Sequence, residues 1–399
     1  MSKNILFLSR TGLLEPLGQS QILTYLSTLS KDYCISIITF EKVSDLNNAT
    51  HVDSIQKICE ANEISWSPIK YRDNLRYIGA VVGFYELFFK TLKVSNRQQI
   101  NCIHLRSYYP IMITLLMHRF KKIPFIFDMR ALWPEELVES GRLRANGISW
   151  KLIKYLEKKC LQKAAAVVSL TYAALDYLDK QYPVFKLKEK TTVIPTCADL
   201  KRFDLKEAQF DYNKITISCV GSMLTGWFKI DILKTVIHYL LDQYENVNFE
   251  FLTRDDKTKL FSKLDLTDHY ANRISFASVL FEDMPNRIAK HDGSVFFFTP
   301  GVAKLGSAPT RMAELLGTGI PVLTNSGVGD VGSIIKDHNV GVLIALETVE
   351  NIKKSCDEFI NLISQKDIDK ECRYTAVKLF SLESGVERYR AIYKTILNL

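Results

Sequence analysis

The 399-residue sequence lacks the features that define several protein classes. Its eight cysteines are scattered, with no Cys-x-x-Cys pair and no metal-ligand spacing, so neither a disulfide framework nor a zinc site is indicated. The most apolar stretch, residues 78–89, is too short to cross a bilayer and is interrupted by Glu86. No low-complexity tract is present, and the first ten residues contain too short an apolar run for a signal peptide. We therefore expect a globular cytoplasmic protein with buried thiols.

Common ligand motifs are also missing. No Gly-x-Gly-x-x-Gly sequence follows the apolar run at residues 4–9, which argues against a nicotinamide-dependent oxidoreductase. No aromatic-plus-basic motif stands out, so we expect no nucleic-acid partner. Carboxylates with metal-ligand spacing are absent as well, and we expect no metal and no other cofactor.

What is present is a net charge of +8 that lies entirely in the first half. Residues 1–200 contain 27 Lys and Arg against 18 Asp and Glu, whereas residues 201–399 contain 25 against 26. The apolar stretch 78–89 lies in this basic half. Four basic residues flank it: Arg72, Arg76, Lys90 and Lys93. The stretch fits either a core helix or a helix at an anionic membrane surface, and an ordinary solvated surface also explains part of the charge.

The length predicts two domains, and the apolar pattern predicts their architecture. Short apolar runs alternate with helical segments, which indicates parallel sheets with helices on both faces. The expected strands of the first half are 4–9, 34–40, 102–105, 125–127, 164–169 and 192–194, with helices near 19–30 and 150–161. Those of the second half are 214–220, 248–252, 274–276, 295–298, 321–323 and 341–344. We expect two doubly wound α/β domains, 1–200 and 201–380, joined near 195–211 and facing a cleft, with a last helix at 381–399 crossing back to the first domain.

Residues 304–314 form the strongest candidate binding site. They follow an apolar strand, and Pro309 fits the first turn of a helix. The amino end of a helix offers unpaired N–H groups and a positive dipole to an anion. Lys304 and Arg311 add cations, Ser307 and Thr310 add hydroxyl donors, and Glu314 adds an acceptor one turn deeper. The set suits a nucleotide sugar, in which a diphosphate lies near vicinal hydroxyls, although an amphipathic helix with a solvated Glu explains the same pattern without a ligand.

A second candidate lies where two strands of the first half end. Asp128 ends one strand and Arg130 follows it, and Arg106 ends another. Ligands of open α/β sheets bind at the carboxyl ends of strands, so Asp128 is a candidate to orient or deprotonate an acceptor hydroxyl. A structural Asp–Arg ion pair is the alternative.

Several segments resemble the retaining glycosyltransferases of the GT-B fold in glycosyltransferase family 4. Residues 193–203, V-I-P-T-C-A-D-L-K-R-F, resemble the interdomain segment of that family. Residues 307–322 resemble a variant of its donor loop and helix, and residues 12–21 resemble the turn that approaches the donor phosphates. Residues 380–383, F-S-L-E, match the segment before the final helix.

The sequence departs from the family at three places. Gly306 stands where the family has the first of two donor glutamates, and Ser222 stands where it has an arginine. Lys229 is the only candidate for the phosphate-binding lysine of the family, and it matches that position weakly. The acceptor-side histidine is replaced within residues 127–136, F-D-M-R-A-L-W-P-E-E.

The resemblance implies transfer of a hexose from a nucleotide diphosphate sugar, with retention of anomeric configuration and without metal. The catalytic residues it implies are Asp128, Arg130, Lys304 and Arg311. The donor-binding residues are Gly18, Gln19, Gly221, Ser222, Lys229, Thr253, Arg254, Ser307, Pro309, Thr310 and Glu314, with the loop at 280–283 bordering the nucleotide. Arg106, Tyr108 and Trp133 are expected on the acceptor side, in a first domain that binds acceptor while the second binds nucleotide sugar.

A nucleotide-sugar epimerase of the same twin-domain plan is the alternative enzyme, although Gly306 removes one carboxylate that it would use. The basic, partly apolar first half favours a lipid-linked or polysaccharide acceptor. We accordingly expect a cytoplasmic protein, with peripheral contact at the inner face of the cytoplasmic membrane as a further expectation.

Overall fold

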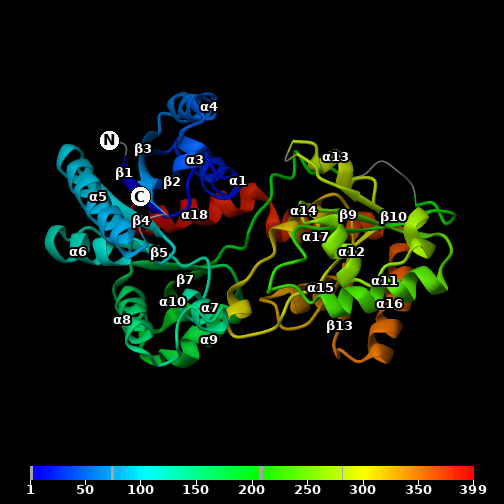
Figure 1. Cartoon of the computed structure of the whole chain (residues 1–399). Helices are drawn as coiled ribbons and strands as arrows, with labels where there is room; N and C mark the ends of the chain where they lie inside the picture. The colour runs from blue at the N-terminus through cyan, green and yellow to red at the C-terminus, as the bar shows by residue number, and fades with distance from the viewer. Residues whose placement is uncertain (1–2, 73–75, 206–209, 281) are drawn as a thin grey trace. The chain divides into compact units, whose positions relative to one another are not determined.

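A computed structural model describes residues 3–72, 76–205, 210–280 and 282–399 of the chain (Figure 1). The chain divides into two compact units, Met1–Pro195 with Gly385–Leu399, and Thr196–Ser384. Two parts of the sequence-based assignment lie outside the described residues. These are residues 206–209 of the expected connection and Phe281 of the expected nucleotide-bordering loop.

The first unit contains a seven-stranded parallel sheet in the order β3-β2-β1-β4-β5-β6-β7. Its β-branched and aromatic side chains form near-continuous apolar runs, as expected for strands covered on both faces. The strands are β1 (Lys3–Ser9), β2 (Tyr33–Lys42), β3 (Ser65–Tyr71), β4 (Ile100–Arg106), β5 (Phe125–Asp128), β6 (Ala166–Ser169) and β7 (Thr191–Val193).

Helices cover both faces of this sheet. Right-handed crossovers place the connections from β1 to β2 and from β2 to β3 on one face, and the connections from β3 onward on the other. The first face has α1 (Pro16–Gly18), the π-helix η1 (Gln19–Leu23), α2 (Thr24–Leu29), α3 (Val43–Leu46) and α4 (Ala49–Ala61). The second has α5 (Arg76–Arg97), α6 (Ile111–Lys121), α7 (Trp133–Glu139), α8 (Ile148–Lys163), α9 (Tyr172–Gln181), η3 (Pro183–Phe185) and α10 (Leu187–Lys190).

The last helix, α18 (Leu382–Leu397), belongs to the first unit from Gly385 onward. Its buried face contacts the strands through two tyrosines. The Tyr393 hydroxyl lies 2.7 Å from Nδ1 of His104, and the Tyr389 ring packs against the same imidazole. The final helix therefore returns to the first unit, as expected from the sequence.

The second unit contains a six-stranded parallel sheet in the order β10-β9-β8-β11-β12-β13. The strands are β8 (Ile215–Val220), β9 (Val247–Leu252), β10 (Ile274–Ala277), β11 (Gly293–Phe296), β12 (Val322–Asn325) and β13 (Gly341–Ile344). The helices are α11 (Ile230–Gln243), α12 (Lys257–Lys263), η4 (Asp268–Arg273), α13 (Met284–Ile288), η5 (Ala303–Gly306), α14 (Thr310–Gly317), α15 (Val331–His338), α16 (Val349–Ile363) and α17 (Ile368–Phe380). One apolar core packs α11 and α16 against the sheet, and a second packs α14, α15 and α17 against its other face.

The doubly wound, parallel-sheet fold class is confirmed for both units. Three local expectations differ from the structure. The strand β3 was not anticipated, because Pro68 lies within it; β3 is an edge strand, where a missing N–H is tolerated. The expected helix at 19–30 begins at Pro16 and contains the π-turn η1. Pro309 is the N-cap of α14, not a first-turn residue, since its ψ of 115° is extended.

Seven of the eight cysteines are buried, and Cys34 is exposed. The stretch 78–89 lies within α5, with Leu87 buried but Val81, Tyr85 and Phe89 exposed. This helix therefore combines a core face and an exposed apolar stripe.

Candidate functional site

The amino end of α14 lies on the loop that follows β11 in the second unit. Buried Met312, Leu315 and Leu316 fix the helix against the sheet. Glu314 is 6% exposed, and its carboxylate is paired with the guanidinium of Arg311 one turn before it. Burial raises the pKa of Glu314, while Arg311 and Arg202 act to lower it. The expected pair of Arg311 and Glu314 therefore lies together, at the first turn of the helix.

Lys304 lies in η5, just before this helix. Its ammonium lies 4.1 Å from the ring centroid of Trp227, a cation–π contact between η5 and the loop after β8. The N–H of Gly329 donates to the carbonyl of Lys304 at 2.8 Å. Ser307 and Thr310, both half-buried, complete the segment that leads into α14. Six of the expected site residues thus lie on one short segment, namely Lys304, Ser307, Pro309, Thr310, Arg311 and Glu314.

The turn after β8 is held by a carboxylate that follows β9. The N–H of Leu224 donates to Asp255 at 3.0 Å, and Ser222 and Met223 donate to the same carboxylate at 2.5 Å. The N–H of Asp255 in turn donates to the Thr253 hydroxyl at 3.0 Å. These bonds lower the pKa of Asp255 against the opposing effect of its burial.

The same turn contains Gly221, whose φ of 119° is a conformation that residues with a side chain rarely adopt. Arg254, beside Thr253, is exposed. Gly221, Ser222, Thr253 and Arg254 therefore lie together at the carboxyl ends of β8 and β9.

The chain from Trp227 to Lys229 runs beside the end of β11. The N–H of Lys229 donates to the carbonyl of Phe297 at 3.0 Å, and the N–H of Thr299 donates to the carbonyl of Trp227 at 2.9 Å. The Lys229 ammonium lies 2.6 Å from the carboxylate of Glu347. Lys229 thus lies near the carboxyl end of β11, and its ammonium has a carboxylate partner that the sequence did not reveal.

Asp128 lies in a buried cluster of the first unit. It is 1% exposed and accepts a hydrogen bond from the Tyr389 hydroxyl at 2.9 Å. His104 and Arg106 each lie 3.5 Å from its carboxylate, and Arg130 lies 3.9 Å away. Arg130 has a positive φ of 62°, the left-handed conformation. The strand-end residues Asp128, Arg130 and Arg106 are therefore together, with two partners from β4 and α18.

The electrostatics of this cluster favour the ion-pair alternative for Asp128. Burial alone would raise the pKa of its carboxyl, but Arg130, His104 and Arg106 lower it to about 2. Burial also lowers the pKa of Arg106 to about 10. A general base works best with a pKa near the operating pH, and a buried carboxylate with a pKa near 2 is poorly suited to that role.

Tyr108 and Trp133 adjoin a second buried polar cluster. The Tyr108 hydroxyl donates to Glu157 at 2.7 Å, and its ring centroid lies 5.7 Å from that of Trp133. Lys154 is paired with both Glu157 and Glu135, the latter at 3.1 Å. Burial, followed by the charge of Glu157, raises the pKa of Tyr108 well above its ordinary value. Tyr108 is therefore a structural hydroxyl rather than an exposed contact for an acceptor.

Gly18 ends α1 and Gln19 begins η1, the first helical segments after β1. A Cβ on Gly18 would lie 1.7 Å from the carbonyl oxygen of Gly12, so the glycine permits a close approach of two backbone segments. The Gln19 amide lies 3.1 Å from Nε2 of His51. The buried carboxylate of Glu41 holds the turn before α1 through the N–H of Leu13, at 2.7 Å.

Within the described residues, no three His, Cys, Asp or Glu side chains gather as a metal-binding group. No helix among the described residues is both long and apolar enough to span a membrane.

Comparison with known proteins identifies the class of fold. Residues 53–202 match the family model described as Glycosyltransferase Family 4. No curated protein matches the chain. The chain is similar to the crystal structure of a glycosyltransferase from Rickettsia africae ESF-5, at 15% identity and a TM-score of 0.69, over 99% of each chain.

Two further solved structures have the same fold. Anabaena Alr3699/HepE in complex with UDP and glucose is 12% identical, with a TM-score of 0.64 over 98% of this chain and 99% of that one. The E. coli trehalose-6-phosphate structure bound with UDP-2-fluoro glucose is 10% identical, with a TM-score of 0.66 over 100% and 99%. The fold is therefore that of the GT-B glycosyltransferases, and residues 53–202 contain the family 4 match.

Sequence reasoning missed the partners that hold the expected residues. Asp255 anchors Ser222, Glu347 pairs with Lys229, and Tyr389 donates to Asp128. The position of Asp255, two residues after Thr253 at a strand end, was a usable signal. No sequence signal identified Glu347 or Tyr389 as a partner, because both are distant in sequence from the residues they contact.

Proposed function

We propose that the protein is a glycosyltransferase that moves a hexose from a nucleotide diphosphate sugar to an acceptor, with retention of anomeric configuration and without a metal ion. The family 4 match over residues 53–202 favours transfer over the epimerase alternative. The single observation that carries the proposal is the position of Lys304, Arg311 and Glu314, grouped at the amino end of α14 beside the carboxyl ends of the strands.

The difficult step is the departure of a diphosphate from an oxocarbenium-like sugar. In our proposal the first N–H groups of α14 and the cations of Lys304 and Arg311 stabilise the negative charge that develops on this leaving group. Ser307 and Thr310 donate hydrogen bonds to phosphate oxygens, and Pro309 directs the chain into the helix. These cations take the part that a metal ion has in other transferases.

Glu314 holds the ribose hydroxyls in this proposal. A carboxylate is a strong acceptor for vicinal hydroxyls. Because Arg311 is paired with Glu314, the same contact sets the direction of the guanidinium toward the phosphates. Gly221, Ser222, Thr253 and Arg254 border the nucleotide, and Lys229 approaches its phosphates.

Arg130 is the proposed acceptor-side cation of the first unit, and Arg106, which is only 5% exposed, shares its Asp128 partner. Asp128 keeps both guanidinium groups charged and in place, so we assign it a positioning role. Tyr108 and Trp133 support this edge of the sheet from the polar cluster beside it.

UDP is the first nucleotide to test, because the HepE and trehalose-6-phosphate structures contain UDP or a UDP sugar. Thermal shift with UDP-, GDP- and other nucleotide sugars identifies the donor, and membranes incubated with radiolabelled donors reveal the acceptor. Transfer that survives EDTA, with product of the donor's anomeric configuration by NMR, is the expected result. A product of inverted configuration refutes the retaining mechanism. Activity that EDTA abolishes and Mg²⁺ restores refutes metal independence.

A lipid-linked acceptor at the inner face of the cytoplasmic membrane fits the outer surface of the first unit. The exposed apolar residues of α5 (Val81, Tyr85 and Phe89) recur every four positions, so they form one stripe. The α5 helix contacts α6, where Lys121 lies 3.1 Å from the Ser95 hydroxyl, and α8 exposes Leu152 and Tyr155.

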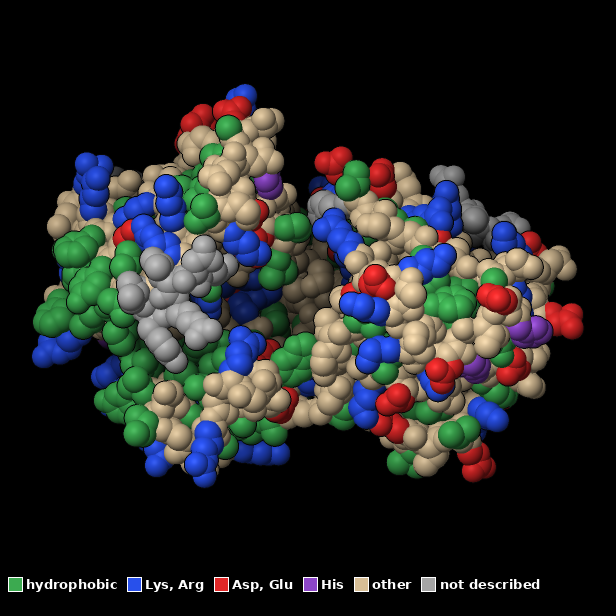
Figure 2. All heavy atoms as spheres, in the orientation of Figure 1, with side chains coloured by type: hydrophobic (Ala, Val, Ile, Leu, Met, Phe, Trp, Pro, Cys, Tyr) green, Lys and Arg blue, Asp and Glu red, His purple; other side chains and the backbone are tan. Residues whose placement is uncertain are grey.

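Figure 2 shows hydrophobic side chains gathered with Lys and Arg over this side of the first unit. Exposed cations of the same three helices include Lys93, Arg97, Arg119, Lys121, Lys151, Lys158 and Lys163. An apolar stripe among cations is the composition that binds anionic bilayers, so we propose peripheral membrane contact here. The side chain of Arg76, one of the expected flanking cations, lies outside the described residues.

Cosedimentation with phosphatidylglycerol vesicles tests the membrane contact. Phe89→Ser removes an exposed ring, so we expect a several-fold loss of bound protein, whereas Leu346→Ser, an equally exposed apolar residue of the second unit, leaves binding unchanged. Equal loss in both variants, or no binding to the vesicles by the wild type, rejects the proposed surface.

A further inference from the structure

A polar pocket of about 350 Å³ lies at the amino ends of the strands of the second sheet. It is lined by residues at the starts of β8, β9 and β10 and by residues in and after α13. Gly221 and Thr253, by contrast, follow the carboxyl ends of β8 and β9. The pocket is therefore at the opposite end of the sheet from the proposed donor site.

Positive charge dominates the lining. Four of its residues are cationic, namely Lys214, Arg273, Arg287 and Lys290, and Glu250 is the one carboxylate among the described lining residues. Both lysines are exposed, and neither forms an ion pair within the described part of the chain. Concentration of one sign of charge in a concave site attracts an anion.

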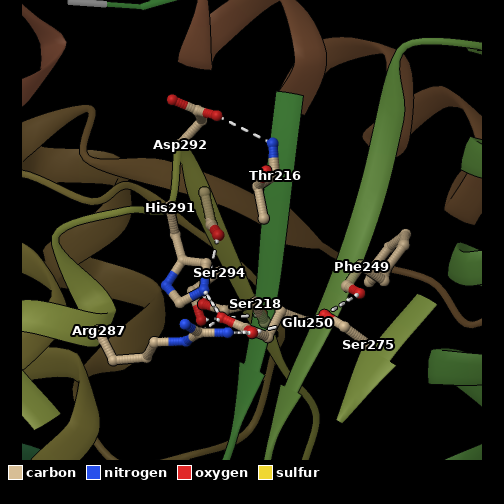
Figure 3. Close-up of polar contacts among 10 residues, drawn as sticks. Thr216, Ser218, Phe249, Glu250, Ser275, Arg287, His291, Asp292 and Ser294 are labelled. Atoms are coloured by element: carbon tan, nitrogen blue, oxygen red, sulfur yellow. Dashed lines mark hydrogen bonds and ion pairs between the residues drawn. The ribbon is translucent and has the colours of Figure 1, made fainter. Parts of the chain in front are cut away.

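Glu250 is already neutralised, as Figure 3 shows. Its Oε2 accepts from Nε of Arg287 at 2.9 Å, its Oε1 accepts from Nη2 of the same guanidinium, and His291 lies 2.7 Å from Oε2. This pairing fixes the Arg287 guanidinium in the wall of the pocket. It leaves Nη1 of Arg287 outside the bonds to the carboxylate.

Arg273 forms no ion pair with a carboxylate of the described residues. Its guanidinium donates to two backbone carbonyls, those of Leu241 at 2.7 Å and Tyr244 at 3.1 Å. These bonds hold the side chain in one position but do not cancel its charge. Three of the four cations, Lys214, Arg273 and Lys290, thus remain without a carboxylate partner among the described residues.

Most of the remaining lining residues have uncharged hydrogen-bonding groups. Asn248, Asn272, Thr216 and Ser275 contribute amides and hydroxyls, and Phe249 and Ile274 are the apolar residues. The Ser275 hydroxyl lies 3.4 Å from Glu250, so the strand start of β10 adjoins the ion-paired wall. Amides and hydroxyls beside a cationic wall suit a ligand that has both hydroxyl groups and an anionic group.

We propose that this pocket binds a phosphate monoester of a small polyhydroxyl compound, in chemical class a sugar phosphate. The phosphate dianion is held between the two lysines and the guanidinium of Arg287, and Asn248, Asn272 and Thr216 hydrogen-bond to the hydroxyls. A volume of about 350 Å³ accommodates a compound of this size and is near the lower end of small-molecule pockets, which begin at roughly 300 Å³. The site is independent of the proposed donor site and exists whether or not the protein transfers sugar.

Isothermal titration calorimetry of the full chain tests this site, with glucose 6-phosphate, glucose and inorganic phosphate as separate probes at constant ionic strength. Glucose 6-phosphate is expected to bind more tightly than either of the other two. The Lys214→Ala/Lys290→Ala double variant is expected to bind it about tenfold or more weakly, because two charged contacts are lost. Lys263→Ala, an exposed lysine of α12 outside the pocket, is the matched control and leaves affinity unchanged.

Each outcome decides the proposal. Undetectable binding to the wild type, or equal affinity in the double variant, overturns the site. If inorganic phosphate binds as tightly as glucose 6-phosphate, the pocket does not recognise the sugar, and that part of the proposal is overturned. Binding that persists in Glu314→Ala separates this pocket from the donor site, and binding lost in that variant places the ligand there instead.

Discussion

Replacing Asp128 with Asn tests whether the buried cluster of the first unit is structural. The variant keeps the size of the side chain and an oxygen for the Tyr389 hydroxyl, but it removes the negative charge that faces Arg106 and Arg130. The guanidinium groups of buried Arg106 and half-buried Arg130 then have no counter-charge at this position. We expect the first unit to lose stability.

The magnitude follows from the pKa of Asp128. A pKa lowered from 3.8 to about 2 corresponds to roughly 2.5 kcal/mol of unfolding free energy. Removing one member of a buried ion pair typically costs about 3–5 kcal/mol, so we expect a loss of about 2–4 kcal/mol at pH 7. Because the pKa is depressed in the folded state, this stabilisation is full above about pH 4 and is lost as the pH falls toward 2.

Urea unfolding followed by circular dichroism measures the effect. Asp32→Asn is the matched control, because Asp32 also pairs with an arginine, Arg390 at 2.8 Å, but is 43% exposed. We expect the control to change the unfolding free energy by less than about 1 kcal/mol. A loss below about 0.5 kcal/mol in Asp128→Asn, with transfer activity abolished, refutes the structural role and restores Asp128 as a candidate base.

Three other predictions concern the helix α1 and the donor site. Gly18→Ala places a Cβ 1.7 Å from the Gly12 carbonyl oxygen, so we expect a lower melting temperature and about 1–3 kcal/mol less stability. Gly226→Ala, with open space around the added Cβ, is the control. Equal melting temperatures of the two variants contradict the packing argument. Arg311→Ala is expected to lower kcat roughly 100-fold with a smaller change in the donor KM, and a change in KM alone argues against leaving-group stabilisation. Lys304→Met should reduce kcat in the same way, whereas an unchanged steady-state rate removes this ammonium from the site.

The sequence was sufficient for the architecture because the apolar runs of buried parallel strands have a strong, local signature. It located β13, Gly341–Ile344, at both ends, and it located the return of the last helix to the first domain. The edge strand β3 was not predicted, because Pro68 and exposed polar residues interrupt its apolar pattern. The π-helix η1 was not predicted, because side-chain periodicity does not distinguish it from a continuous α-helix.

The candidate site was predictable only as far as its residues are close in sequence. Lys304, Arg311 and Glu314 lie within one loop and helix, so their grouping could be inferred from spacing. The carboxylate partner of Lys229 is Glu347, on a different element, and nothing local identifies it. The buried state of Asp128 depends on Tyr389 of α18, a contact across most of the chain.

Calorimetric titration of UDP into Glu314→Ala tests the central claim most directly. Losing a charged hydrogen-bond acceptor costs about 1.5–3 kcal/mol, so we predict a dissociation constant about 10- to 100-fold higher than that of the wild type. Glu350→Ala, an exposed glutamate at the start of α16, should bind UDP as the wild type does. Equal affinity of Glu314→Ala and wild type, with both folded, would contradict the placement of the nucleotide at the amino end of α14.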